Sequence, residues 1–89
     1  MQIGDKVKWA SQANGIWKEK RGVLRAILGP DDDVYDVLPP GLPKSRFKGS
    51  RRSLNRRALV EVPRGGKSKL SDFYAPYLSV LEKIGGEHE

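Results

Sequence analysis

The chain has 89 residues and no cysteine, and its 17 basic and 11 acidic residues give a formal net charge of +6. At this length we expect one domain with a small core, because only ~60% of the unfolded surface becomes buried. The lack of cysteine excludes disulfides and thiolate metal sites. Residues 1–5 lack the basic start and apolar run of a secretory signal, and no apolar run nears the ~20 residues that span a bilayer. We therefore expect a cytoplasmic protein without membrane contact.

Short apolar runs, divided by glycine, proline and aspartate, predict an all-β chain. Polar and apolar residues alternate over residues 6–9, which predicts a first strand after the turn Gly4-Asp5. A polar loop around the turn dipeptide Asn14-Gly15 is expected over residues 11–21. Residues 22–28 then predict a second strand, which Gly29 and Pro30 end.

The second half of the chain continues this pattern. Residues 34–38 predict a third strand and residues 58–62 a fourth, each followed by prolines and glycines. A last apolar element begins at Phe73, is interrupted by Pro76 and ends near Leu81. Residues 85–89 are expected to form a flexible tail.

This spacing predicts a small antiparallel barrel of about five strands, whose closure would remove exposed sheet edges. Within residues 50–59 the alternative is a short helix, capped by Ser50, that places Leu54 and Ala58 on one face. The period-two pattern predicts a core made of Val7, Trp9, Val23, Ile27, Val37, Val60 and Leu78.

Two segments resemble a known scaffold. Ile3-Gly4-Asp5-Lys6-Val7 and the later Gly22-Val23-Leu24 resemble the opening hairpin of SH3-like barrels of the KOW and Tudor type. The run from Phe73 to Leu81 resembles their closing strand, tight turn and last strand. Together with Gly41-Leu42-Pro43, that ending is also similar to short uncharacterised bacterial and phage proteins. The resemblance implies one SH3-like domain over residues 1–84 with residues 44–57 as a basic loop insertion. Relatives of this class bind RNA, DNA, ribosomal or polymerase partners, or peptides.

The positive charge is concentrated in one segment. Residues 44–57 carry a charge of +7 with no acid, so the rest of the chain sums to −1. Such a run can neutralise the phosphates of a polyanion and release counterions, and arginine offers a planar fork of donors to phosphate. The alternative is a solvated loop whose charge aids solubility. The cations of this segment are Lys44, Arg46, Lys48, Arg51, Arg52, Arg56 and Arg57.

Two aromatic residues lie among cations. Phe47 stands between two cations and Trp17 precedes Lys18, so each is a candidate for stacking on an unpaired base. For Trp17 the alternative is a lid that folds over an open end of the barrel. Trp9 follows the period of the first strand, and we expect it in the core.

Other chemistry finds little support in the sequence. The run Asp31-Asp32-Asp33 lacks the alternating ligands and central glycine of a calcium loop, which favours an acidic turn. His88 has no partner for a zinc site. Gly65-Gly66-Lys67-Ser68 lacks the earlier glycine of a phosphate-binding loop. We expect no enzymatic activity, no cofactor and no small-molecule substrate.

The sequence thus predicts a non-catalytic nucleic-acid-binding module that favours RNA somewhat over DNA. The basic segment would contact phosphates, while Trp17, Lys18 and Phe47 would bind bases and backbone nearby. The alternative is a protein-interaction module, in which a groove between residues 11–21 and the basic segment binds an acidic or extended peptide.

Overall fold

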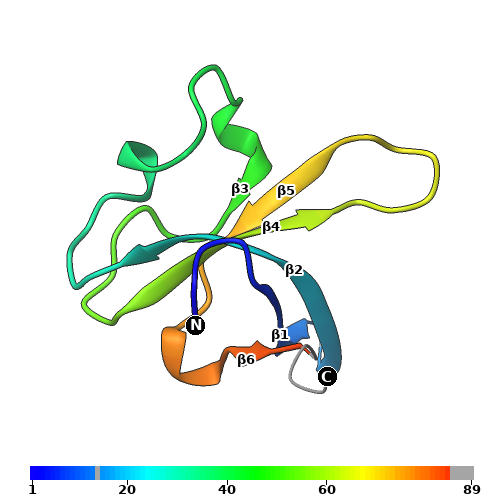
Figure 1. Ribbon diagram of the computed structural model, residues 1–89, viewed down its shortest axis with the longest axis horizontal. Helices are drawn as coiled ribbons and strands as arrows, with labels where there is room; N and C mark the ends of the chain where they lie inside the picture. The colour runs from blue at the N-terminus through cyan, green and yellow to red at the C-terminus, as the bar shows by residue number, and fades with distance from the viewer. Residues whose placement is uncertain (14, 85–89) are drawn as a thin grey trace.

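The computed structural model describes residues 1–13 and 15–84 and folds them around one six-stranded sheet (Figure 1). Short 3-10 helices are the helical elements of these residues, so the predicted all-β class is confirmed. The expected tail, residues 85–89, lies outside the described residues. The strands are β1 (Lys6–Ala13), β2 (Ile16–Leu28), β3 (Phe47–Lys48), β4 (Arg57–Pro63), β5 (Ser71–Tyr74) and β6 (Glu82–Lys83), and the 3-10 helices are η1 (Val34–Asp36), η2 (Lys44–Arg46) and η3 (Leu78–Val80).

The sheet is open, with the order β3-β5-β4-β2-β1-β6. All neighbouring strands are antiparallel except β3 and β5, which run parallel. The prediction of a closed barrel is therefore wrong, although the curved sheet retains the predicted strand class. The edge strands β3 and β6 have two residues each, and such short edges offer little to a foreign strand, so closure is not needed to protect them.

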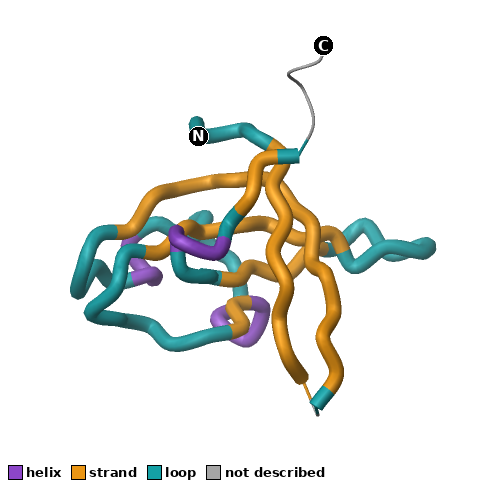
Figure 2. The backbone as a smooth tube through the Cα atoms, turned by 90° about the horizontal axis from the view of Figure 1, so that it is seen from below, coloured by secondary structure: helices purple, strands orange, loops and turns teal. Residues whose placement is uncertain are grey.

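The largest departure from the sequence prediction is the hairpin of β1 and β2. The sequence predicts a loop over residues 11–21, but the two strands pair without interruption from Lys6 opposite Val23 to Ala13 opposite Ile16. The outer half, residues 10–13 and 15–20, projects from the body as a two-stranded ribbon that we call the hairpin arm (Figure 2). Both faces of the arm carry polar side chains, so the apolar alternation that marks a strand is missing there.

The predicted third strand is also wrong. Residues 34–36 form η1, because the carboxylate of Asp33 accepts a hydrogen bond from the amide of Tyr35 at 3.0 Å and caps the turn. Val34 and Leu38 are buried, whereas Val37 is 40% exposed. A spacing of four residues between buried positions is typical of a helical turn and not of a strand.

Two apolar clusters cover the two faces of β4. Ala58 and Val60 belong to the first and Leu59 to the second, and all three are fully buried. β4 begins at Arg57 as predicted for a strand in this region, and residues 50–56 form no helix. The first cluster contains Val7, Trp9, Leu24, Ala58, Val60 and Leu81; the second contains Leu28, Val34, Leu38, Phe47, Leu59 and Phe73.

A bulge in β2 explains why Ile27 is not the core residue that the sequence predicts. Val7, Trp9 and Val60 are buried as predicted, and Val23 and Leu78 are half-buried. Ile27 is 46% exposed and, like Val37, does not belong to the core. The register shifts between Leu24 and Ala26, so Leu24 enters the first cluster while Ala26 and Leu28 face the second. A regular period of two cannot predict this switch.

Gly22 allows β2 and β4 to approach each other closely. A Cβ atom at this position would lie 2.3 Å from the carbonyl oxygen of Glu61 and 2.8 Å from a methyl group of Val60. The backbone cannot move away there, because the neighbouring Leu24 is fully buried. The glycine is therefore required by the packing at the base of the hairpin.

A pair of leucines tests the importance of β4. Leu59→Ala should lower the free energy of unfolding by about 2–5 kcal/mol, because Leu59 is fully buried. Leu54→Ala removes the same atoms from a side chain that is 79% exposed. This variant should change the free energy of unfolding by less than about 0.5 kcal/mol. Urea unfolding measures both, and equal losses would contradict the described core.

Candidate functional site

The seven cations of the basic segment do not form one surface. Arg57 is 3% exposed, and its guanidinium donates to the carbonyl oxygens of Ser50 at 2.6 Å and Arg51 at 3.3 Å. Nε of Arg46 donates to the carbonyl oxygen of Ser71 at 2.8 Å and fastens η2 to β5. These two side chains bond to backbone carbonyl groups and so take part in holding the fold together.

Two further cations are engaged by the buried Asp33. Its carboxylate forms ion pairs with Arg51 at 2.6 Å and Arg52 at 3.5 Å. The backbone is joined at the same place, since the amide of Val34 donates to the carbonyl oxygen of Arg51 at 2.9 Å. The hydrogen bond from Arg51 is the main reason why the pKa of Asp33 falls from its ordinary value of 3.8 to about 2.

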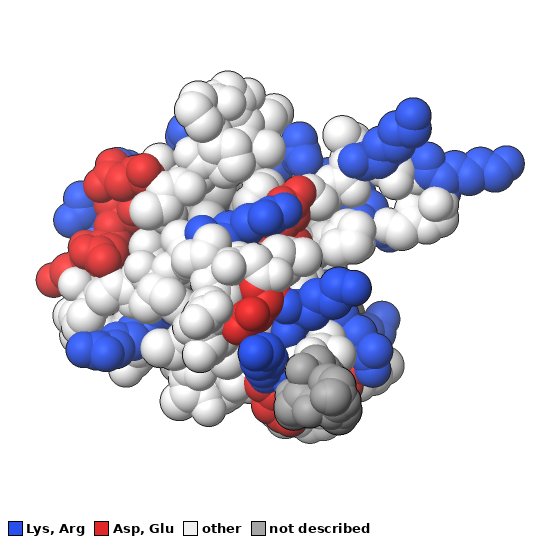
Figure 3. Space-filling model, viewed as in Figure 1, with Lys and Arg blue, Asp and Glu red and all other residues white. Residues whose placement is uncertain are grey.

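The ring of Tyr35 also makes cation–π contacts with two residues of the basic segment. Nζ of Lys44 lies 4.7 Å from the ring centroid and Cζ of Arg51 lies 4.6 Å from it. Both distances are within the range of cation–π attraction. The positive charges of Lys44, Arg51 and Arg52 are therefore held against the acidic turn at residues 31–36. Figure 3 shows acidic and basic side chains together at this end of the molecule.

Acid unfolding tests the pairing of Asp33. The pKa of Asp33 is depressed in the folded chain. The ion pairs therefore stabilise the fold fully above pH 3.8, the pKa of an ordinary aspartate, and this stabilisation is lost as the pH falls to about 2. Asp33→Asn removes the titrating group. The free energy of unfolding should therefore fall more steeply for the native chain than for the variant across this window. Urea unfolding at several pH values checks this, and parallel curves would contradict it.

Phe47 is not available for stacking. Its side chain is 8% exposed and packs in the second apolar cluster, beside Phe73. The parallel pairing of β3 with β5 places Phe47 opposite Phe73 and Lys48 opposite Tyr74, so the two side chains of β3 point to different faces. The prediction that Phe47 binds a base is wrong, because this short strand makes it part of the core.

Lys48 instead lines a groove between the hairpin arm and β5. Its neighbour across the strands, Tyr74, contacts Trp9 with ring centroids 5.9 Å apart in an edge-to-face arrangement. Nζ of Lys20 lies 4.8 Å from the centroid of Tyr74. We call this hollow of about 230 Å³ the lysine–tyrosine groove; its lining is Trp9, Ser11, Lys20, Lys48, Tyr74, Ala75 and Pro76.

The lysine–tyrosine groove is electropositive. Within residues 1–13 and 15–84, neither Lys20 nor Lys48 forms an ion pair with a carboxylate. Asp72 is paired with Arg64 at 2.8 Å, which is the main reason why the pKa of Asp72 is lowered, and the charge of Lys48 lowers it further. A groove lined by two lysines and by aromatic rings suits an anion that carries a flat or apolar group.

Trp17 and Lys18 lie on the hairpin arm. Trp17 stands opposite Gln12 and Lys18 opposite Ser11. Directly opposed residues share one face of an antiparallel pair, so Lys18 shares the face of Ser11 and Lys20 while Trp17 lies on the other. Trp17 is 67% exposed and belongs to neither apolar cluster, so it is not a lid on the core.

Two tryptophan variants test this placement. Trp17→Ala should change the free energy of unfolding by less than about 1 kcal/mol, since the ring is mostly exposed. Trp9→Ala should cost about 3–5 kcal/mol, because Trp9 is 6% exposed and packs in the first cluster. Thermal and urea unfolding compare them. A large loss in Trp17→Ala would restore the lid hypothesis.

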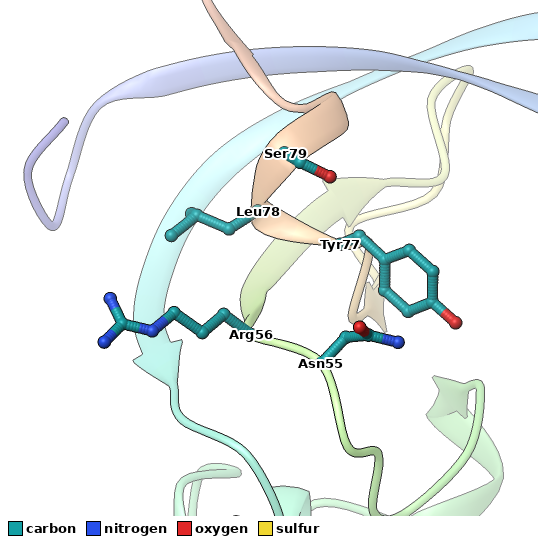
Figure 4. A pocket seen from close by; sticks show the side chains of 5 residues that line it. All are labelled: Asn55, Arg56, Tyr77, Leu78 and Ser79. Carbon is teal, nitrogen blue, oxygen red and sulfur yellow. The ribbon is translucent and has the colours of Figure 1, made fainter.

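A second, larger hollow of about 390 Å³ lies at the start of β4 (Figure 4). Its lining residues are Asn55, Arg56, Tyr77, Leu78 and Ser79. The side chains of Arg56 and Leu78 extend to one side, while the ring of Tyr77 and the amide of Asn55 lie together on the other. We call it the Arg56–Tyr77 hollow. Arg56 is exposed and, among the described residues, forms no ion pair.

Of the residues that line the two hollows, the sequence analysis proposed Lys48 and Arg56 as contacts but not Lys20, Tyr74 or Tyr77. Lys18 and Lys20 alternate with Trp17 and Glu19, a pattern that assigns the lysines to one face once residues 16–20 are taken as a strand. The loop between β4 and β5 projects from the body (Figure 1), and it contains the exposed residues Lys67 and Lys69.

The chain matches no family model, no curated protein and no solved structure. In the part of the chain that the structure describes, no three His, Cys, Asp or Glu side chains gather as a group that could hold a metal ion. In that same part, no helix is long and apolar enough to cross a membrane. The geometry of the site is thus the evidence on function.

Proposed function

We propose that the chain is a non-catalytic nucleic-acid-binding module that holds a single strand in the lysine–tyrosine groove. The observation that carries this proposal is the pair of lysines, Lys20 and Lys48, which line one groove and have no carboxylate partner among the described residues, with Lys20 over the ring of Tyr74.

The chemistry of the groove matches a nucleotide. A phosphate between the two ammonium groups would release counterions, and a base or sugar would lie against the rings of Tyr74 and Trp9. A duplex keeps its bases within the stack, so an aromatic floor favours an unpaired strand. The hydroxyl of Ser11 lines the same groove, and hydroxyl contacts to the 2′-OH favour RNA over DNA.

The basic segment has a divided role in this proposal. Lys48 and Arg56 contact the ligand, while Arg46, Arg51 and Arg57 shape the surface that supports them. Lys18 extends the positive face of the hairpin arm next to Ser11, and Trp17 is available on the other face for a separate contact. A cytoplasmic location, where RNA is accessible, belongs to the same proposal.

Charge-removing variants test the groove. Lys20→Gln and Lys48→Gln should each weaken binding to an oligouridylate of about eight nucleotides. The slope of log K against log salt should become shallower by about 0.7 for each phosphate that the variant no longer neutralises. Lys6→Gln is the matched control, because Lys6 is an exposed cation of β1 outside the groove. Fluorescence anisotropy over a salt series measures these changes, and unchanged slopes would exclude the groove.

A second candidate function, binding of an extended peptide, is favoured by the outer edge of β1. The carbonyl oxygen of Lys6 bonds to the amide of Ile84, so the backbone groups of Ala10 and Gln12 point to this same edge. β6 pairs with β1 only at Val7 and Lys8, and no other described strand continues along the edge. A peptide strand could add there.

Amide measurements with an oligouridylate and with an acidic peptide separate the two functions. Nucleic acid in the groove should shift the amide signals of Lys20, Lys48 and Tyr74. Strand addition should slow hydrogen exchange at the amides of Ala10 and Gln12. Shifts with the peptide alone would favour the protein-interaction module over the nucleic-acid-binding one.

A further inference from the structure

We infer that the single strand held in the lysine–tyrosine groove continues into the Arg56–Tyr77 hollow, so that the site binds at least two consecutive nucleotides. This inference rests on the proposed function and extends it. Lys20 and Lys48 contact the first phosphate, and Arg56 contacts a second. Tyr74 and Tyr77 offer one ring to each position. The ligand class is therefore a single-stranded oligonucleotide and not an isolated nucleotide.

The first step is that the linings of the two hollows meet along the chain. Pro76 lines the lysine–tyrosine groove, and the next residue, Tyr77, lines the Arg56–Tyr77 hollow. A strand that leaves the groove along the segment from Tyr74 to Ser79 would therefore meet the lining of the second hollow next.

The second step is that β4 holds the two hollows in a fixed relation. The amide of Ala58 donates to the carbonyl oxygen of Pro76 at 3.0 Å, and the amide of Leu78 donates to the carbonyl oxygen of Arg56 at 3.0 Å. Arg57 and Tyr77 form a β-bridge between these contacts. The backbone that separates the hollows is therefore hydrogen-bonded to the buried central strand. This segment is already ordered, so binding a ligand would not cost the entropy of ordering it.

The third step is the chemistry of the second hollow. Arg56 is exposed, lacks a described carboxylate partner and presents a planar fork of donors that fits a phosphate. The ring of Tyr77 belongs to a residue that is 49% exposed, and the amide of Asn55 lies beside it (Figure 4). A base stacked on this ring would have the amide of Asn55 near its polar edge. A hollow of about 390 Å³ is within the ~300–1,000 Å³ of small-ligand sites.

The experiment uses the full chain and an oligouridylate of about eight nucleotides. Arg56→Gln should weaken binding by about tenfold and make the salt slope shallower by about 0.7. Tyr77→Ala should weaken binding by about tenfold, whereas Tyr77→Phe retains the ring and should bind like the native chain. Lys6→Gln is the charge control. Amide spectra and thermal melting verify that each variant is folded, and calorimetry gives the number of oligonucleotides per chain.

The outcomes are distinguishable. Weaker binding in both Arg56→Gln and Tyr77→Ala, with one oligonucleotide per chain, supports the continuous site. If Lys20→Gln and Lys48→Gln weaken binding while Arg56→Gln and Tyr77→Ala do not, the groove functions alone and the extension is wrong. Two oligonucleotides per chain would also overturn it, because the hollows would then be separate sites. If the native chain binds no oligonucleotide, the proposed function itself fails.

Discussion

The strand β4 is covered on both faces, and the rest of the molecule is arranged around that burial. A chain of 89 residues has few apolar side chains, and it places them in two clusters separated by the backbone of this strand. The first cluster anchors the base of the β1–β2 hairpin through Val7, and the second anchors the segment with η1 and η2 through Val34. Both walls of the lysine–tyrosine groove, the hairpin arm and β5, are thus fixed by the burial of β4.

Much of the basic segment serves this architecture. Arg57 is buried and donates to backbone carbonyl groups of residues 50 and 51, and the carboxylate of Asp33 pairs with Arg51 and Arg52. A buried carboxylate without a cation would be strongly destabilising, so the acidic turn and the arginines depend on each other. A run of charge along a sequence therefore does not predict an equal patch on the surface, because long side chains reach carboxylates and carbonyl groups that are distant in sequence.

The sequence predicted those elements in which one face is buried against a cluster. The strand at residues 58–62, the short first strand and the all-β class follow from the apolar pattern, and the structure confirms them. The hairpin arm was missed because neither of its faces is apolar, and η1 was missed because the cap by Asp33 competes with extended backbone. Lys48, which the sequence analysis proposed as a phosphate contact, is exposed in the structure. Its partnership with Lys20 and Tyr74 depends on the pairing of β3 with β5, a long-range parallel contact that no local pattern indicates.

The location of the free lysines on strands changes how a ligand would be bound. A flexible basic loop loses conformational entropy when it closes on a phosphate, and this loss lowers affinity. Lys20 and Lys48 extend from paired strands, and Lys20 already rests over the ring of Tyr74, so most of that ordering is complete before binding. A rigid site of two or three cations gives a shallower salt dependence than the seven cations of the segment would give as a loop. In the proposed complex, contacts with the rings of Tyr74 and Tyr77, which salt screens little, would then account for a larger share of the binding energy.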